Sequence, residues 1–439
     1  MTAMPVVRGL PVVGSALEMA RDPAAFFVTN FRRHGPVFRV RVLNRSHPVL
    51  AGPEAATFLG TAAGRDSLRS KEFWQGLVDE YGANRTILGE DGASHRELRD
   101  IMRRGYSRDA IKDRLAELVE ITDRAIDRDW AAGARVPVVR ALQNMVTDQL
   151  GQLLTGSARP EYVGDIRIST QYTLNVLVTR QWPRILLWDP RYRRAKRRVF
   201  ELSETLAAHH RPGAGDLIDD VMQAHRDRPA VMPAADLPIT LTGPFVAGLD
   251  TVASTTAAVV YEVLRDPDVL ARVRADADAL FADGTAITER DLRGLTALHG
   301  ALLETMRLHP IAVTQMRTAT RDFEFAGHRI AAGETVFVAT SVPHFLDEFF
   351  PDPARFDIDR YEKPRAEHLQ PGAYSPYGRG QHVCLGKTLA DVQMTVLLAR
   401  LLHRLDLRLD PPGYRLAKRT APVPGPALSF RVRVTAHRH

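Results

Sequence analysis

Cysteine is almost absent from this chain of 439 residues, in which Cys384 is the only one. One thiol excludes an intrachain disulfide and any zinc site built from several thiolates. It also fits the reducing cytoplasm in which we expect the protein to work. The N-terminal segment lacks an apolar run that would serve as a signal peptide or a membrane span, so we expect a soluble protein. Zinc-finger, helix-turn-helix and RNP-like patterns are missing too, so the formal net charge of +7 does not indicate nucleic-acid binding.

Internal repeats, low-complexity segments and linkers are also missing, which predicts one domain over residues 1–439. Strand-like runs occur in the first sixty residues and return between residues 323 and 340. Helical periodicity dominates from Phe73 to about Leu308. A proline-rich coil, a glycine loop, an apolar helix and a terminal strand complete the chain. The expected fold class is mainly α with a small β subdomain.

The lone cysteine lies in the stretch YGRGQHVCLG, residues 377–386. Gly378, Gly380 and Gly386 bracket Cys384, and glycine lets the backbone come close to another body. A sulfur just before a helix N-terminus is stabilised as thiolate by the helix dipole and free amides. The loop therefore suits the presentation of a thiolate to a large flat ligand. A buried structural cysteine is the alternative.

This loop resembles the haem-binding signature of the cytochrome P450 superfamily, in the soluble bacterial type. The matching positions are Tyr377, Gly380, Cys384 and Gly386, with His382 two residues before the cysteine. The resemblance covers essentially the whole chain. It implies a P450 fold in which haem b lies between a long distal helix and the proximal cysteine loop.

By this resemblance Cys384 is the axial ligand of the haem iron. An anionic thiolate pushes electron density onto iron and favours O–O cleavage. Most of the family has Phe where this chain has Tyr377, so we expect the extra hydroxyl to form a hydrogen bond and shift the redox potential.

Two further motifs resemble parts of the family's scaffold. Glu304 and Arg307 are three residues apart on one helix face, and with Arg355 of the segment PDPARF they resemble the buried structural triad that supports the haem loop. Buried charges must be paired to be tolerated, so we expect these three residues to be structural rather than catalytic.

A second set resembles the family's haem-propionate ligands. His95 and Arg99 lie four apart on one predicted helix face, Arg317 occupies the matching strand position, and His382 completes the set. Propionates are anionic, so charge-assisted hydrogen-bond donors suit them.

The segment GPFVAGLDTVASTTAAVV resembles the helix that crosses the distal haem face. Ala247 and Gly248 are small enough to leave room for dioxygen. Asp250 and Thr251 match the acid–alcohol pair that delivers protons, with Thr251 toward the oxygen and Asp250 toward solvent or a cation. Pro244 and Gly248 predict a distorted helix here.

The family's variable pocket stretches are mostly apolar in this chain, which favours a hydrophobic substrate. A terpenoid or polyketide-like secondary metabolite is the substrate class that we expect. The predicted pocket residues are Phe73, Phe245, Val313, Gln315 and Val423.

No flavin or nicotinamide fingerprint occurs, so we expect electrons from a separate ferredoxin or flavodoxin and its reductase. Arg99, Arg103, Arg104, Arg108 and Lys112 form a basic segment that would steer an acidic partner. A solubilising surface excess is the alternative explanation of the positive charge.

Three functions remain open at this point. The first is a monooxygenase that uses O2 and two external electrons to hydroxylate or epoxidise its substrate. The second keeps the haem but performs oxidative coupling or desaturation without oxygen insertion. The third is a haem sensor, against which the Asp250–Thr251 pair argues, because a sensor has no need of proton delivery.

Overall fold

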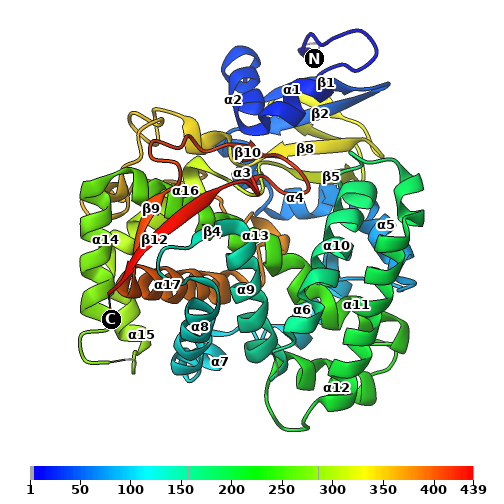
Figure 1. The fold of residues 1–439 in the computed structure, drawn as a ribbon. Coiled ribbons are helices and arrows are strands. Elements are labelled where there is room, and N and C mark those ends of the chain that lie inside the picture. Colours follow the sequence, from blue (N-terminus) through cyan, green and yellow to red (C-terminus); the bar gives the residue numbers. More distant parts are fainter. Residues whose placement is uncertain (1–3, 157, 285, 439) are drawn as a thin grey trace.

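The computed structural model describes residues 4–156, 158–284 and 286–438. Helices make up most of the molecule, and the largest sheet lies at the end that carries the N-terminal segment (Figure 1). The expected fold class, mainly α with a small β part, is confirmed.

The helices follow the apolar periodicity of the sequence, and the longest of those described is α13. They are α1 (Ala16–Arg21), α2 (Pro23–His34), α3 (Pro53–Phe58), α4 (Ala62–Ser67), α5 (Lys71–Tyr81), α6 (Gly92–Met102), α7 (Arg108–Lys112), α8 (Leu115–Asp129), α9 (Val138–Thr155), α10 (Val163–Thr173), α11 (Pro190–His209), α12 (Leu217–Asp227), α13 (Leu237–Arg265), α14 (Pro267–Leu280), α15 (Glu289–Arg293), α16 (Thr296–Leu308) and α17 (Lys387–Arg404).

The strands form one mixed sheet and three smaller antiparallel ones. They are β1 (Val37–Val42), β2 (Arg45–Ala51), β3 (Leu68–Arg69), β4 (Arg135–Pro137), β5 (Gln315–Ala319), β6 (Phe323–Phe325), β7 (His328–Ile330), β8 (Thr335–Ala339), β9 (Leu405–Leu409), β10 (Lys418–Arg419), β11 (Gly425–Pro426) and β12 (Arg431–His437). The large sheet has the order β1-β2-β8-β5-β3, with β2 and β8 parallel. The others are β4-β12-β9, β10-β11 and β6-β7.

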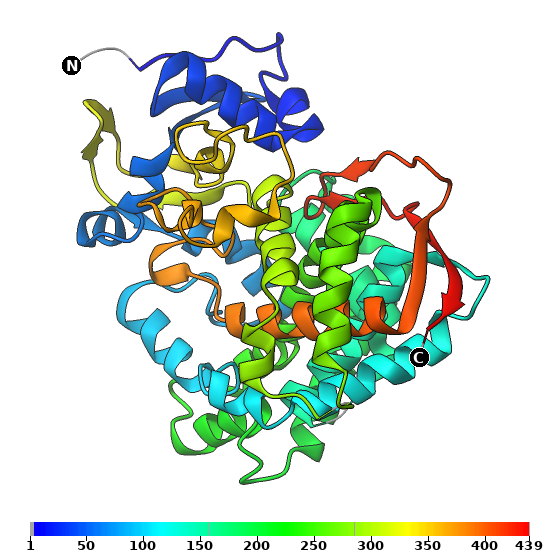
Figure 2. The same cartoon turned by 90° about the vertical axis from the view of Figure 1, so that its left-hand side faces the viewer.

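The main hydrophobic core is helical and surrounds α13, which packs against α9, α16 and α17. Figure 2 shows α17 running crosswise to α14 and α16. Two smaller apolar clusters lie on the two sides of the large sheet. Because α17 follows the cysteine loop directly, this packing also places the loop.

Helix α13 is buried along most of its 29 residues. Pro244 has no amide hydrogen, so the carbonyl of Thr240 lacks its helical donor. The structure nevertheless keeps one continuous α-helix through Pro244 and Gly248, so the expected distortion does not interrupt it. By length and composition the span Ala234–Arg265 could cross a membrane, but 72% of its apolar window is buried within the protein, as in a core helix.

A buried ion network joins α16 to the coil that precedes the cysteine loop. Glu304 accepts hydrogen bonds from Arg307 through both oxygens, each over 2.8 Å. Its Oε1 also accepts from Nε of Arg360 over 3.1 Å, and its Oε2 from the phenol of Tyr361 over 2.7 Å. The carboxylate and both guanidinium groups have 0–1% of their side-chain surface exposed.

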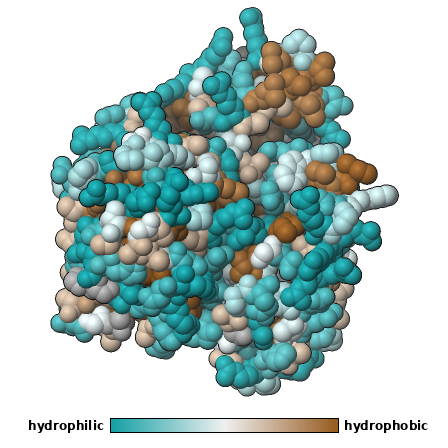
Figure 3. All heavy atoms as spheres, in the orientation of Figure 1, coloured by the Kyte–Doolittle hydropathy of each residue, from teal (hydrophilic) through white to brown (hydrophobic). Residues whose placement is uncertain are grey.

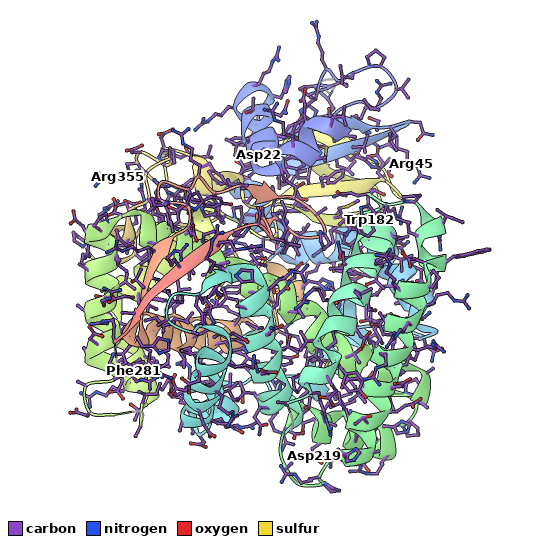
Figure 4. All side chains as sticks on the ribbon, viewed as in Figure 1. Asp22, Arg45, Trp182, Asp219, Phe281 and Arg355 are labelled. Atoms are coloured by element: carbon purple, nitrogen blue, oxygen red, sulfur yellow. The ribbon has the colours of Figure 1, made fainter. Side chains whose placement is uncertain are left out.

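The third member of this network is Arg360, and the prediction of Arg355 was wrong. The Arg355 side chain is exposed and is labelled at the outer edge of the molecule in Figure 4. Its contribution is a backbone carbonyl that accepts from Arg307 over 3.3 Å. Both arginines lie in the same proline-rich coil, so only the path of that coil in space decides which one reaches the carboxylate.

We expect Arg360→Ala to destabilise the haem-loaded protein by about 3–5 kcal/mol, because it leaves buried carboxylates without their partner. Arg355→Ala is the matched control, and a change within about 0.5 kcal/mol is expected for that exposed side chain. Urea unfolding followed by circular dichroism measures both. Equal losses in the two variants would contradict the assignment.

Candidate functional site

The cysteine loop has a backbone that only glycine accommodates easily at two positions. Gly378 and Gly380 have φ of +72° and +75°. A Cβ on Gly380 would lie 2.2 Å from the carbonyl oxygen of Leu59, far inside contact distance. The turn is closed by the Cys384 amide, which donates to the carbonyl of Tyr377 over 3.0 Å. The loop is thus held against the rest of the protein at a fixed distance from the α17 N-terminus.

The side chain of Cys384 is exposed in the structure. Burial of the surrounding loop raises the pKa of the Cys384 thiol, whereas a hydrogen bond from the Gly386 backbone and the charges of Arg99 and Lys387 lower it. The sulfur is therefore accessible to another group.

Cationic and imidazole side chains from separate segments gather around this cysteine. Arg99 of α6 donates to the carbonyl of Val383 over 2.9 Å, next to the sulfur. The rings of His95 and His382 are 4.5 Å apart. His382 donates to Asp91, the residue just before α6, over 2.8 Å, so the structure brings the start of α6 together with the cysteine loop.

Asp91 is a residue of this cluster that the sequence reasoning missed. Its Oδ1 also accepts from Gln381 over 2.9 Å, and its Oδ2 accepts from the Ser70 amide over 2.8 Å. Burial raises the pKa of Asp91, but hydrogen bonds from His382 and Ser70 outweigh burial and hold that pKa below its usual value. The carboxylate thus ties the cysteine loop to the start of α6.

Arg317 of β5 completes the predicted set, and Gln315 lies beside it. Alternate residues of a strand share a face, and Arg317 donates to the side-chain oxygen of Gln315 over 2.6 Å. Burial lowers the pKa of Arg317 to about 10, which leaves it cationic at neutral pH. A Cβ on Gly378 would approach Gln315 Nε2 to 2.8 Å. Gln315, predicted to face substrate, therefore packs between Arg317 and the cysteine loop.

The cluster carries unused hydrogen-bonding capacity. His95 Nδ1 and Gln315 Nε2 are buried and have no hydrogen-bond partner among the described residues. Burial lowers the pKa of His95 to about 4, so its ring is neutral at neutral pH. Buried polar groups are normally paired, and the surplus here is of donors. The residues fit a large group that carries carboxylates and also a metal ion that can accept the sulfur of Cys384 as a ligand.

Helix α13 exposes one small residue in a mostly buried stretch. Ala247 is accessible, and Thr251, one turn later on the same face, is half-buried. The Thr251 hydroxyl donates to the Ala247 carbonyl over 2.7 Å. Both residues therefore keep accessible surface. Gly248 does not, because a Cβ there would approach Cδ1 of Leu150 to 2.7 Å. Its missing side chain serves the packing of α9, which corrects the prediction that it leaves room for dioxygen.

Asp250 turns away from Thr251 and meets a cation that the sequence reasoning did not name. Arg419 of β10 donates to both carboxylate oxygens, over 2.9 and 2.7 Å. Arg419 also donates to Ser254 over 2.7 Å, and Gln143 of α9 donates to Asp250 over 2.8 Å. The expected cation beside Asp250 is thus present. No local pattern could identify it, because it is 169 positions away.

The hydroxyl of Tyr377, which Phe would lack, forms a hydrogen bond with a neighbouring acid, as we expected. It donates to Asp391 of α17, and Lys387 lies 5.5 Å from the centre of its ring. Burial raises the pKa of Asp391, while the bond from Tyr377 lowers it. The polar end of the tyrosine therefore points to the helix rather than to the sulfur.

The other predicted pocket residues fall into two groups. Phe245 and Val313 are buried, with 1% and 6% of their surface exposed, in two different apolar clusters. Phe73 and Val423 are half-buried. In this structure the latter pair retains surface that a ligand could contact.

The basic segment from Arg99 to Lys112 is largely neutralised in the folded protein. The ion pairs are Arg103–Asp100 at 3.5 Å, Arg104–Asp220, Arg108–Glu289 at 2.8 Å and Lys112–Asp109 at 2.9 Å. Carboxylates from α12 and α15 supply two of these partners, which sequence spacing does not reveal. The expectation of a strongly cationic docking face along this segment is therefore corrected.

Comparison with known proteins agrees with this geometry. Residues 4–422 match the sequence profile of the Cytochrome P450 family. Over 422 residues the chain is 27% identical to "Putative cytochrome P450 139" of Mycobacterium tuberculosis, covering 92% of this chain and 96% of that protein. It is also 27% identical, over 424 residues, to "Cyclooctat-9-en-7-ol 5-monooxygenase" of Streptomyces melanosporofaciens, covering 92% of this chain and 89% of that enzyme.

The fold is shared with solved structures. One described as "Retinoic acid bound cyanobacterial CYP120A1" superposes with a TM-score of 0.86 over 100% of both chains, at 23% identity. The "cytochrome P450DA heme domain" gives 0.86 over 100% of this chain and 98% of that one, at 20% identity. With the family profile spanning nearly its whole length, the chain belongs to the cytochrome P450 family of haem b-dependent monooxygenases.

Proposed function

We propose that the protein inserts one oxygen atom of O2 into a C–H or C=C bond of a hydrophobic small molecule. The observation that carries this proposal is the cluster around Cys384: an accessible sulfur, surrounded by His95, Arg99, Arg317 and His382 from three segments of the chain. No simpler role explains why donors in excess of acceptors are collected beside one thiol.

Each residue of the cluster has a separate task in this proposal. Cys384 is the thiolate ligand of the iron, and the Gly386 amide helps to hold its negative charge. The four donors hold the two carboxylates of the cofactor through charge-assisted hydrogen bonds. When bound, the haem supplies the activation of O2, and the thiolate favours cleavage of the O–O bond. Tyr377 keeps an aromatic ring near the sulfur, with its hydroxyl held by Asp391.

Proton supply is assigned to the α13 pair. Thr251 keeps accessible surface beside Ala247 on α13 and orders a proton donor at that face. Asp250 faces the interior on the other side, where Arg419 and Gln143 hold both of its oxygens. These hydrogen bonds fix the carboxylate in place, so that it can take up a proton on one side and release it on the other without admitting bulk water. Arg419 acts as a positioning residue because it touches Asp250 and not the reacting atoms.

The apolar pocket residues and a similar enzyme support the proposed substrate class, and the sequence motifs support a separate electron source. The half-buried, apolar Phe73 and Val423 favour a hydrophobic ligand. A similar enzyme of Streptomyces is named for the oxidation of cyclooctat-9-en-7-ol, which supports a terpenoid-like secondary metabolite. We assign electron supply to a separate ferredoxin or flavodoxin with its reductase, in the cytoplasm.

Isotope labelling tests the reaction itself. With O2 labelled by oxygen-18 and an electron-supply system, the product of a terpenoid substrate that shifts the Soret band should gain one labelled atom. A product that has lost two hydrogens or gained a new C–C bond, with no label, would replace oxygen insertion by desaturation or coupling. A substrate that binds without any product would favour a sensor.

The cysteine ligand is tested by the carbon monoxide spectrum of the reduced protein. The wild type should show the red-shifted Soret band of thiolate ligation, and Cys384→Ser should lose it while keeping its far-ultraviolet circular dichroism. His382→Gln is a control, because it changes the propionate cluster and leaves the sulfur in place; its band should persist. A histidine-type spectrum in the wild type would contradict the assignment.

The proton pathway is tested by the ratio of product formed to reduced cofactor consumed. We expect Thr251→Ala to bind substrate normally but to divert electrons to hydrogen peroxide. Asp250→Asn should slow oxygen consumption on the order of a hundredfold, a typical loss for removal of a proton-transfer group. Thr256→Ala is the matched control: it removes a hydroxyl from the same helix, bonded in the same way to the carbonyl of Val252. Wild-type coupling in Thr251→Ala would exclude the alcohol.

A further inference from the structure

The positive charge of this protein is concentrated in one segment. Residues 180–198 contain eight basic residues and one acidic residue, a net charge of +7, which equals the net charge of the whole chain. The remaining sequence is therefore neutral as a whole. The segment connects the end of α10 to the first half of α11 and includes a short 3-10 turn, Arg184–Trp188.

Most of these cations are exposed and unpaired. Lys196 and Arg198 pair with carboxylates of the fold, over 2.7 Å in each case. Asp189, the one acid of the segment, accepts from the phenol of Tyr172 over 2.5 Å. Six others are exposed and form no ion pair with any of the described residues: Arg180, Arg184, Arg191, Arg193, Arg194 and Arg197. One of these six arginines precedes the turn, one lies on the turn and four lie on α11, and such a group of exposed cations indicates an anionic binding partner.

Large apolar side chains project from the same turn. Trp188 is 76% exposed and Ile185 is 65% exposed, and arginines flank them on both sides. An exposed tryptophan has no folding reason to stay in water. Indole rings beside arginines are typical of proteins that bind at the headgroup level of a bilayer, where the ring is half solvated and the cation meets lipid phosphate.

A second apolar group lies on the same side of the molecule. Figure 3 shows one brown area over the N-terminal segment beside α1 and β1, and another over the chain between α10 and α11. Arg45 and Trp182, from these two regions, are labelled near each other in the upper right part of Figure 4. The exposed members near the N-terminus are Val6 (59%), Leu10 (52%), Val12 (78%), Leu17 (59%) and Leu43 (54%).

We propose that this arginine–tryptophan face, residues 180–197 together with the exposed apolar residues near the N-terminus, binds the surface of an anionic lipid bilayer. A planar surface can touch both apolar groups at once, and dispersed arginines need no defined pocket when the negative charges are mobile lipids. The contact is with the bilayer surface only. Among the described residues, α13 belongs to the single stretch that is long and apolar enough to span a membrane, and it is mostly buried in the core. The face would also bring the protein to the phase in which a hydrophobic substrate collects; this last point alone rests on the proposed function.

Co-sedimentation of the haem-loaded protein with vesicles tests the proposal without any turnover. Binding to phosphatidylcholine vesicles that contain phosphatidylglycerol should be clear at low salt and fall as salt rises. Pure phosphatidylcholine should bind much less. Arg193→Glu with Arg194→Glu should weaken the binding at least about tenfold. Trp188→Ser should weaken it with little change in the salt dependence, because it removes an apolar contact.

The matched control makes the same charge change elsewhere. Arg290 and Arg293 are exposed on α15, at the far end of the molecule in Figure 1, and replacement of both by Glu should leave vesicle binding within about twofold of wild type. Soluble glycerol phosphate should not release the protein, since a free headgroup offers no surface. Absence of sedimentation, equal losses in both double variants, or binding to an acidic protein without binding to vesicles would overturn the proposal.

Discussion

The support of the cysteine loop depends on one buried carboxylate. Glu304 has no exposed surface and satisfies its charge with two guanidinium groups and a phenol. Charges that are taken out of water must be paired almost completely, so Arg307, Arg360 and Tyr361 have to be in place together. The coil that carries two of them has little regular structure, and hydrogen bonds from both arginines to its carbonyls replace the ladder that a sheet would provide.

The need to pair buried polar groups also applies beside the cysteine, where hydrogen-bond donors rather than a carboxylate have to be satisfied. Here donors exceed acceptors: Arg99, Arg317 and two imidazoles converge, and one carboxylate, Asp91, ties two segments together. Donors in surplus are costly in a dry interior unless an anion completes them. The arrangement fits the haem b of the family, whose carboxylates would complete these donors and whose iron would take the sulfur of Cys384 as a ligand.

One ion pair joins α13 to the hairpin formed by β10 and β11. Arg419 reaches Asp250 and Ser254 together, and a Cβ on Gly425 would be 2.8 Å from Cβ of Ser254. The hairpin is thus pressed against α13, and its tip carries Val423.

The sequence by itself determined the features that depend on residues close together in the chain. These are the helical periodicity, the glycine–cysteine loop, the His95–Arg99 face and the adjacency of Asp250 and Thr251. The tertiary structure decided which charges meet: Arg360 rather than Arg355 at Glu304, Arg419 at Asp250, and carboxylates along the Arg99–Lys112 segment. The tertiary structure also decided that Gly248 packs against Leu150 of α9. The reason is physical, because a Coulomb pair or a packing contact depends on distance in space, and chain packing sets that distance between residues that local patterns cannot relate.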